Sequence, residues 1–465
     1  MYQYILKLAL LIKNYSLVIR SALLMIGFGC LHLIFRFLMS EISGRFSTVR
    51  ASTVPLYASR EFQFSPWILP AIATLIGFNF FASRSISKQS TFLIFTFLFF
   101  GAIGLSVSMI DGFRSVGDEL MPAFLEPYTR SDLEYFGDVP LVDRVGFYHF
   151  LKNYPKPEIF DQLSLHAKTH PPGGVIFLWF ISKIFGHGLL TASLATIGFT
   201  SLAIIPIYLL GKETYNETVA QRAITIFLVL PNFVMFTTTS MDGVFSVFPI
   251  VSVYLFFQAV RSNDLKITIA LGISMAFGFM LTYSTVFVGL FFAVYALLIW
   301  HFNHENFGTV FQRLIIAFAS FVGFFISVFW VSGFNMGESL IRAIQKDAEM
   351  VGSGYESLLR YFLISIGNLS AFMIGSGLPI VILWGQNIKN YWRRKDLFPI
   401  AFLISLLVIS FSTLYTMEVE RIWIFMAPFV VLPIAKSTSR TELRWAIALL
   451  SVQLVVSEMI LYTYW

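Results

Sequence analysis

Residues 241–260 read MDGVFSVFPIVSVYLFFQAV, an apolar stretch of twenty residues whose one charge is Asp242 near its start. A helix of about 20 apolar residues is long enough to cross the hydrocarbon core of a bilayer. Such stretches recur along the whole chain, which predicts an all-α polytopic membrane protein. We expect thirteen spanning helices, at residues 17–38, 66–83, 91–110, 189–211, 218–235, 241–260, 266–283, 284–301, 311–331, 360–385, 397–416, 421–435 and 444–463.

The composition supports this class. Of the 465 residues, 57% are hydrophobic and 12% are charged, which is about half the charged share of soluble domains. So few polar side chains cannot cover the surface of a soluble protein, which excludes a soluble enzyme, a disordered chain and a DNA-binding module. The single cysteine, Cys30, excludes a disulfide framework within the chain. The net charge of +6 is spread over short loops, so we expect the lipid bilayer, and no nucleic acid, as a partner.

One apolar segment is too short to span. Gly173–Phe185 has thirteen residues and is interrupted by Lys183, which favours an interfacial or re-entrant helix. If it does not span and the N-terminus, with Lys7 and Lys13, is cytoplasmic, nearly all basic short loops fall on the cytoplasmic side. We therefore expect a multi-pass protein of the plasma (inner) membrane with three outer segments. The outer segments are residues 39–65, 111–188 and 332–359, and we expect juxtamembrane helices in the second of them. The C-terminus is also expected to lie outside.

The outer segment 111–172 holds many of the acidic residues. Glu134 and Asp138 stand four residues apart, so a helix there would present both carboxylates on one face. Such a pair could share a proton or accept one from a hydroxyl or amine. The alternative is a solvated acidic loop whose charges only keep it out of the bilayer, and spacing alone favours that reading.

The sequence Lys168-Thr-His170-Pro-Pro-Gly precedes the short helix. Two prolines fit the first turn of a helix because that turn does not need their missing N–H groups. Lys168 and His170 then lie beside a helix N-terminus at membrane depth, where anions bind well. A plain helix start with a capping threonine is the alternative.

Two further charged sites begin apolar helices. Asp242 is either an acid that complements a helix N-terminus or the floor of a polar cavity. Glu418-Val-Glu420-Arg421 stands at the start of the short apolar stretch 421–435. An arginine at this end opposes the helix dipole. Arg421 therefore either anchors to lipid headgroups or holds a phosphate through two parallel hydrogen bonds.

The order of these motifs resembles the polytopic GT-C-fold glycosyltransferases, in particular the protein O-mannosyltransferases and the lipid A aminoarabinose transferases. The segment 168–173 resembles their HPPL or KPPL motif. The segments IFGHGLL (184–190) and YLLGKETYNETVAQRAITIFLVLPNF (208–233) resemble their next helical pair, and Glu420-Arg421 before IWIFMAPFVVLP resembles a late ERY-type motif. The similarity covers residues 111–283 well and 397–435 loosely.

The resemblance implies a hexosyl- or pentosyltransferase that uses a polyprenyl-phosphate-linked sugar at the outer face, without a cofactor and, as in many related enzymes, without a metal. A carboxylate would deprotonate the acceptor while the lipid phosphate leaves, with inversion. The acceptor is a lipid, a glycan or a protein. The implied catalytic acids are Glu134 or Asp138, with Asp132, Asp111 and Asp118 in reserve. The implied substrate-binding residues are Lys168, His170, Asp242, Glu420, Arg421 and Tyr283.

Three features depart from the family pattern. The literal Asp118-Glu119 pair lies about 50 residues before His170, farther than the family's acid pair. The lysine often found at Thr282-Tyr283 is absent, and an extra hairpin precedes the helix that resembles the family's first. The chain is accordingly divided into an N-terminal hairpin region (1–90), a GT-C-like catalytic module (91–301) and C-terminal transmembrane helices (302–465).

Two other functions fit many of the same features. A transporter or flippase for a lipid-linked or anionic substrate explains many spans and membrane acids, but usually places its ionisable groups at mid-bilayer in broken helices. Here the acids gather on one outer face, which favours interfacial chemistry. A polysaccharide polymerase or ligase shares the lipid-linked donor and also fits a long outer loop.

Overall fold

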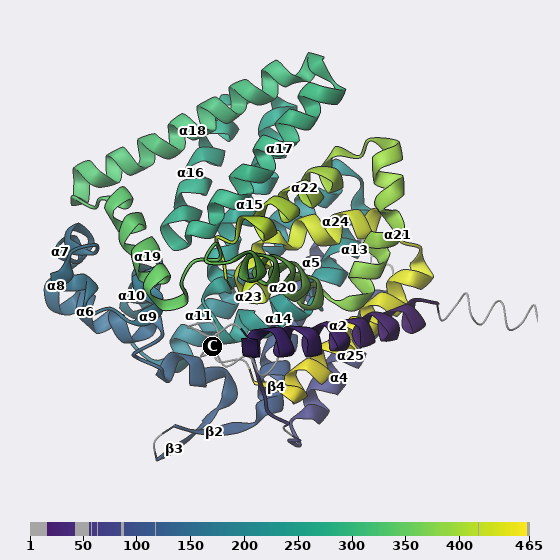
Figure 1. Cartoon of the computed structure of the whole chain (residues 1–465), viewed down its shortest axis with the longest axis horizontal. Helices are drawn as coiled ribbons and strands as arrows, with labels where there is room; N and C mark the ends of the chain where they lie inside the picture. The colour runs from purple at the N-terminus through teal and green to yellow at the C-terminus, as the bar shows by residue number, and fades with distance from the viewer. Residues whose placement is uncertain are drawn as a thin grey trace, which may run out of the picture.

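The computed structural model describes residues 16–41, 55–56, 58–62, 64–84, 88–116, 118–416 and 418–462. Lys7, Lys13 and much of the predicted outer segment 39–65 lie outside these residues. The described chain is almost entirely helical, which confirms the predicted class (Figure 1). Its long helices are α2 (Ser16–Glu41), α4 (Ile68–Ser83), α5 (Gln89–Ser108), α11 (Leu189–Ser201), α12 (Ile204–Thr214), α13 (Glu217–Phe227), α14 (Pro231–Thr239), α15 (Asp242–Ser262), α16 (Leu265–Leu281), α17 (Val286–Phe302), α18 (His304–Ser332), α20 (Leu358–Ser376), α21 (Leu378–Arg394), α22 (Leu397–Ser412), α24 (Ala427–Ser437) and α25 (Arg440–Ile460).

The predicted count of thirteen spans is not confirmed. Among the described residues, 8 helices are long and apolar enough to cross a membrane, or up to 10 if each of two bent pairs is one span. One bent pair is α13 and α14, which meet at 59° where Pro231 begins the second helix. The predicted span 360–385 is interrupted at Gly377, whose φ of 96° ends α20. The predicted span 421–435 is divided into α23 (Val419–Ile422), η5 (Trp423–Met426) and α24.

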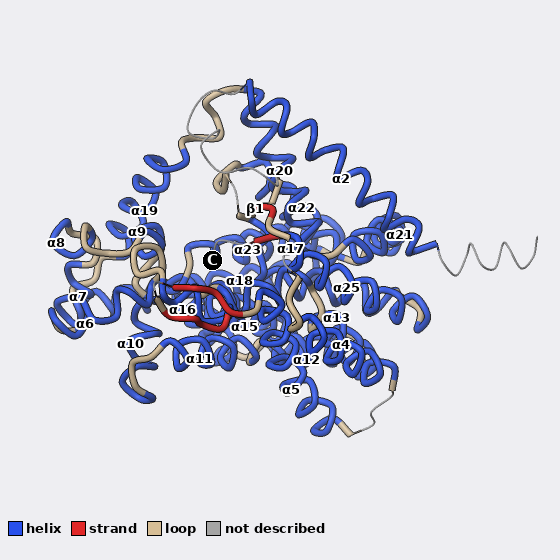
Figure 2. The backbone as a smooth tube through the Cα atoms, turned by 90° about the horizontal axis from the view of Figure 1, so that it is seen from below, coloured by secondary structure: helices blue, strands red, loops and turns tan. Residues whose placement is uncertain are grey.

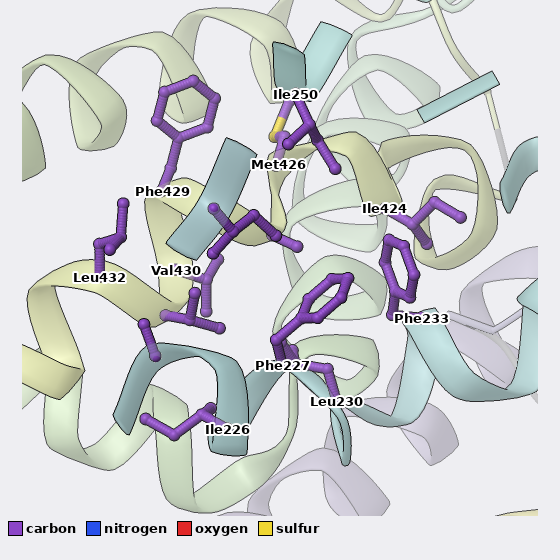
Figure 3. Packing of buried hydrophobic residues seen from close by; sticks show 14 of the residues in the cluster. Ile226, Phe227, Leu230, Phe233, Ile250, Ile424, Met426, Phe429, Val430 and Leu432 are labelled. Carbon is purple, nitrogen blue, oxygen red and sulfur yellow. The ribbon is translucent and has the colours of Figure 1, made fainter. Parts of the chain in front are cut away.

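A large apolar core joins these helices. Figure 3 shows its centre, where α13, α14, α15 and the segment η5–α24 bring aromatic and aliphatic side chains together. The rings of Phe227 and Phe233 lie 4.3 Å apart between centroids, and Phe291 of α17 lies 4.3 Å from Phe429 of α24. This packing holds α15 and α23 in fixed positions, because η5 follows α23 directly and packs against α15.

The segment 111–188 folds as a cap whose core centres on the buried side chains of Val142, Phe150 and Tyr154 and extends to residues of α15 and α16. In Figures 1 and 2 its short helices lie together at one side of the molecule, next to α19 (Met336–Val351). One unpredicted feature is a hairpin of β2 (Phe113–Val116) and β3 (Glu119–Pro122). The other elements are η1 (Met109–Asp111), η2 (Ala123–Thr129), η3 (Tyr135–Asp138), α6 (Val139–Val145), α7 (Phe147–Asn153), α8 (Pro157–Phe160), α9 (Leu165–Thr169) and α10 (Gly173–Phe185).

The short helix α10 has the predicted bounds and, at 13 residues, falls below spanning length. It begins at Gly173, so the two prolines directly precede its first turn, where they were expected to lie within it. Gly173 is required for its packing, because a Cβ there would lie 2.1 Å from the carbonyl oxygen of Met280 in α16. This close approach fixes the HPP segment against the membrane helices.

A second strand pair ties the end of the described chain to the same cap. Strand β1 (Ser59–Arg60) pairs with β4 (Leu461–Tyr462), which follows α25. The Tyr462 hydroxyl donates to Glu126 at 2.7 Å, and the Arg114 guanidinium lies 4.3 Å from the Tyr462 ring centroid.

Candidate active site

The centre of the candidate site is a buried ion-pair group. Arg421 Nε lies 3.3 Å from Asp242 Oδ2, and Arg421 Nη2 donates to Glu418 Oε2 at 2.6 Å. The Arg421 and Asp242 side chains are only 6% and 8% exposed. Ser240 fixes the acid, since its hydroxyl donates to Asp242 Oδ2 at 2.5 Å and accepts from the Asp242 backbone N–H at 3.1 Å. The first turn of α15 therefore holds a carboxylate directly against α23.

A second carboxylate lies in the cap. Glu134 Oε1 is 3.0 Å from His166 Nδ1, and the Glu134 side chain is 8% exposed. Backbone hydrogen bonds bring these residues together, because Leu165 N donates to Asp132 O at 2.9 Å and His166 N donates to Leu133 O at 3.1 Å. Residues 132–134 and 165–166 thus run side by side although η3 and α6 to α8 separate them in the chain.

Tyr135 joins the two groups. Its ring centroid lies 5.5 Å from Phe245 of α15, 5.8 Å from the ring of His170 and 6.1 Å from that of His166. The charges of Arg421 and Glu134 both act on Tyr135. Loop residues of the cap and the first turns of the membrane helices α15 and α23 therefore form one electrostatic unit.

His170 is neutral in this unit, because burial lowers its pKa to about 4. Its Nδ1 lies 3.0 Å from the carbonyl oxygen of His166. A carbonyl can only accept, so Nδ1 carries the proton and Nε2 is left as a hydrogen-bond acceptor. His170 can hold a hydroxyl group through Nε2, but it cannot donate to an anion from that atom.

Asp138 takes a different position from Glu134. Glu134 has extended backbone angles and precedes η3, so the two carboxylates do not share a helical face as expected. Asp138 Oδ1 accepts from Ser164 N at 2.9 Å, and its Oδ2 accepts from Ser164 Oγ at 2.6 Å. Burial raises the pKa of Asp138 to about 6. With one Ser164 hydrogen bond on each oxygen, this side chain holds the loop before α9 in place.

The other predicted residues lie around the unit. Asp132 is exposed, and Lys168 Nζ donates to the Asp161 carbonyl oxygen at 3.0 Å. Glu420 is buried beside Gly375 of α20, where a Cβ would lie 3.2 Å from the Glu420 Cβ. The Tyr283 hydroxyl lies 2.9 Å from Ser339 Oγ, which ties η4 (Tyr283–Thr285) to α19.

The reserve acids belong to the strand-paired region. Asp111 Oδ2 accepts from Arg114 Nη2 at 2.9 Å. Asp118 and Glu119 lie at the turn and start of the β2–β3 hairpin. Among the residues that the structure describes, no three acids, histidines or cysteines gather as ligands for a metal ion.

The sequence predicts no role for His166 or Ser240, and it does not predict that Glu418 pairs with Arg421. Two of them carry a local signal. His166 stands four residues before His170, and Ser240 stands two before Asp242, a spacing that allows a serine to cap the next turn. Glu418 has a left-handed backbone conformation, with a φ of 66°, and its carboxylate contacts Arg421. The sequence does not predict this conformation.

Residues 169–330 match the family model of the dolichyl-phosphate-mannose-protein mannosyltransferases. The matched part includes His170, Asp242 and Tyr283 and extends from the HPP segment through most of α18. No curated protein matches the chain. Over residues 169–330 the chain is thus similar to a family of mannosyltransferases, and together with apolar helices of spanning length this similarity supports a membrane glycosyltransferase of the GT-C type.

Proposed function

We propose that the protein transfers a sugar from a polyprenyl-phosphate-linked donor to an acceptor at the outer face of the membrane, with inversion and with Glu134 as the base. The description of the matched family names dolichyl-phosphate-mannose as the sugar donor, which supports a lipid-phosphate-linked donor for this protein. The observation that carries the proposal is the contact between Tyr135, next to Glu134, and Phe245, one helical turn after Asp242, which pairs with Arg421. A proton acceptor and a cation then stand on two sides of one site.

The chemistry is a single displacement. The acceptor O–H or N–H bond breaks, its proton passes to Glu134, and the acceptor atom forms a bond to the anomeric carbon. The bond from that carbon to the phosphate oxygen breaks, and polyprenyl phosphate leaves with the electron pair. General-base assistance of this kind contributes about 10²–10⁴-fold.

Glu134 suits the base better than the other candidates. Both oxygens of Asp138 accept hydrogen bonds from Ser164, so this carboxyl group is already engaged by the loop before α9. Asp132 is exposed, where solvent competes for the carboxylate. Glu134 is buried, and His166, whose Nδ1 lies 3.0 Å from Glu134 Oε1, can orient it.

Arg421 is proposed to bind the donor phosphate. A guanidinium stays charged and can engage two phosphate oxygens together, which stabilises the charge that develops as the phosphate leaves. Asp242 and Glu418 orient the guanidinium from Nε and Nη2. Because His170 offers an acceptor, we assign it to a sugar hydroxyl instead of the phosphate. Lys168, Glu420 and Tyr283 are proposed to line the approach to the donor.

The alternatives are a flippase and a polymerase or ligase. An assay in detergent solution distinguishes a flippase from a transferase. In detergent there are no two membrane leaflets between which a lipid can be moved, so a flippase would leave the donor chemically unchanged. We expect the purified chain to split a radiolabelled polyprenyl-phosphate sugar when acceptors are added. Intact donor with every acceptor class would contradict the proposal, and transfer of long glycans alone would favour the polymerase or ligase.

A further inference from the structure

Away from the candidate site, α4 and α25 enclose a groove of about 750 Å³. The two helices lie side by side in both views (Figures 1 and 2). The walls are apolar and open to the outside, since Ile76, Phe80 and Val452 are 52%, 66% and 59% exposed. At the floor, Asn79 Nδ2 donates to Ser451 Oγ at 3.2 Å and holds the helices together.

One end of the groove is strongly basic. Arg440 Nη2 and Arg444 Nη2 lie 2.9 and 3.5 Å from the carbonyl oxygen of Ser83, at the C-terminus of α4. Both arginines are exposed and stand in the first turns of α25, where positive charge opposes the helix dipole. The neighbouring acid, Glu442, is engaged by the helix cap, because its Oε2 accepts from Ser439 N at 2.9 Å. The two guanidinium groups therefore concentrate positive charge at this end of the groove, where an anionic group can bind beside the Ser83 carbonyl.

The groove has the length of a single lipid chain. On α25 its lining runs from Arg444 to Val456, which is about 18 Å of helix at 1.5 Å per residue. One leaflet of the hydrocarbon core is about 15 Å thick. A chain that starts at the two arginines would thus reach the middle of the bilayer. The predicted topology places this basic end at the cytoplasmic face, whose anionic lipids attract basic residues.

We propose that this groove binds one acyl chain of an anionic glycerophospholipid, with the lipid phosphate held by Arg440 and Arg444. Charge-assisted hydrogen bonds to the phosphate would distinguish an anionic headgroup from a zwitterionic one of equal chain length. The bound lipid would fill the space between α4 and α25 and support the extra N-terminal hairpin. The site is separate from the proposed transfer chemistry and does not depend on it.

Native mass spectrometry of the purified, delipidated full chain tests this site. We expect the first phosphatidylglycerol to bind at least about tenfold more tightly than phosphatidylcholine with the same chains. The variant Arg440→Gln/Arg444→Gln should lose that preference. The matched control Arg393→Gln/Arg394→Gln, which removes two exposed arginines from the end of α21, should keep it. Arg444→Gln alone, which leaves the Arg440 contact to Ser83, should weaken phosphatidylglycerol binding about threefold or more.

Filling the groove provides an independent readout. Val452→Trp should melt close to the parent, since Val452 is exposed, yet lose the first bound lipid of either kind. Unchanged lipid preference in both arginine variants would overturn the proposal. So would full lipid binding by Val452→Trp, or a dimer of the parent that Val452→Trp dissociates, because the groove would then bind a second copy of the chain.

Discussion

Arg421 Nε lies 3.3 Å from Asp242 Oδ2, so a buried ion pair joins α23 to the first turn of α15. Removal of one partner from a buried pair typically costs about 3–5 kcal/mol, because the other charge is left without compensation. Both residues also belong to the unit that contains Glu134 and His170. The ion pair therefore orients the guanidinium before a donor binds.

Substitution of Arg421 by lysine tests whether the planar guanidinium group binds two oxygens of the donor phosphate. Lysine keeps the charge and can still pair with Asp242 or Glu418, so we expect a melting temperature close to the parent. It lacks the planar fork that engages two phosphate oxygens. The affinity or turnover for the polyprenyl-phosphate donor should fall at least about tenfold. Parental affinity and turnover would show that Arg421 has only a structural role.

Substitution of Glu134 by glutamine tests the base. The amide keeps the shape of the side chain but cannot take the acceptor proton, so turnover should fall about 10²–10⁴-fold. Donor affinity, measured by equilibrium binding, should be nearly unchanged. Asp161→Asn, at an exposed position in the same loop, is the matched control and should keep its turnover. A greater loss in Asp138→Asn than in Glu134→Gln would move the base to Asp138.

The pH dependence of stability should separate His170 from Asp138. The pKa of His170 is about 4 in the folded chain against 6.5 for the free side chain, so its contribution to stability is lost as pH falls from about 6.5 to 4. The pKa of Asp138 is raised from 3.8 to about 6, so its contribution is present at low pH and is lost as pH rises through that window. Each shift corresponds to at most about 3 kcal/mol.

Thermal melting of the solubilised variants between pH 4 and pH 7 measures these opposite effects. Relative to the parent, His170→Asn should lose less stability on acidification and Asp138→Asn should lose more. Parallel pH profiles for parent and both variants would show that neither side chain has a shifted pKa.

The orientation of the cap can be tested by cysteine labelling in a Cys30→Ser background. Glu158 and His187 are exposed on the two sides of α10, so cysteines at both should react with an impermeant maleimide in intact cells or spheroplasts. Arg393→Cys, in a predicted cytoplasmic loop, should react only after the membrane is opened. Labelling at 158 without labelling at 187 would mean that α10 crosses the membrane.

The sequence predicts local features of this fold well. A short apolar length and two prolines are enough to place α10, and Asp242 marks the start of α15, because both depend on neighbouring residues. Helix breaks are harder to predict. Gly377 and Pro231 interrupt apolar runs that appear continuous in hydropathy alone, so the predicted helix bounds differ from the observed ones there.

Contacts between residues that are far apart in the chain could not be predicted from the sequence, and the site depends on them. Glu134, His170, Asp242 and Arg421 are recognisable as candidates, but their contacts depend on how the cap folds against α15. The partnership of Glu134 with His166 follows from backbone hydrogen bonds between residues 132–133 and 165–166, which leave no periodic signal. The role of Asp138 depends likewise on Ser164, which lies 26 positions later.

Release of polyprenyl phosphate by the purified chain tests the central proposal most directly. With a radiolabelled polyprenyl-phosphate sugar and a mixture of lipid, glycan and protein acceptors, the parent should release polyprenyl phosphate in step with labelled product. Glu134→Gln should bind the same donor with parental affinity and release about 10²–10⁴-fold less. Equal release by the two proteins, or donor binding by the parent without any release, would contradict the assignment of this buried unit as a transferase site.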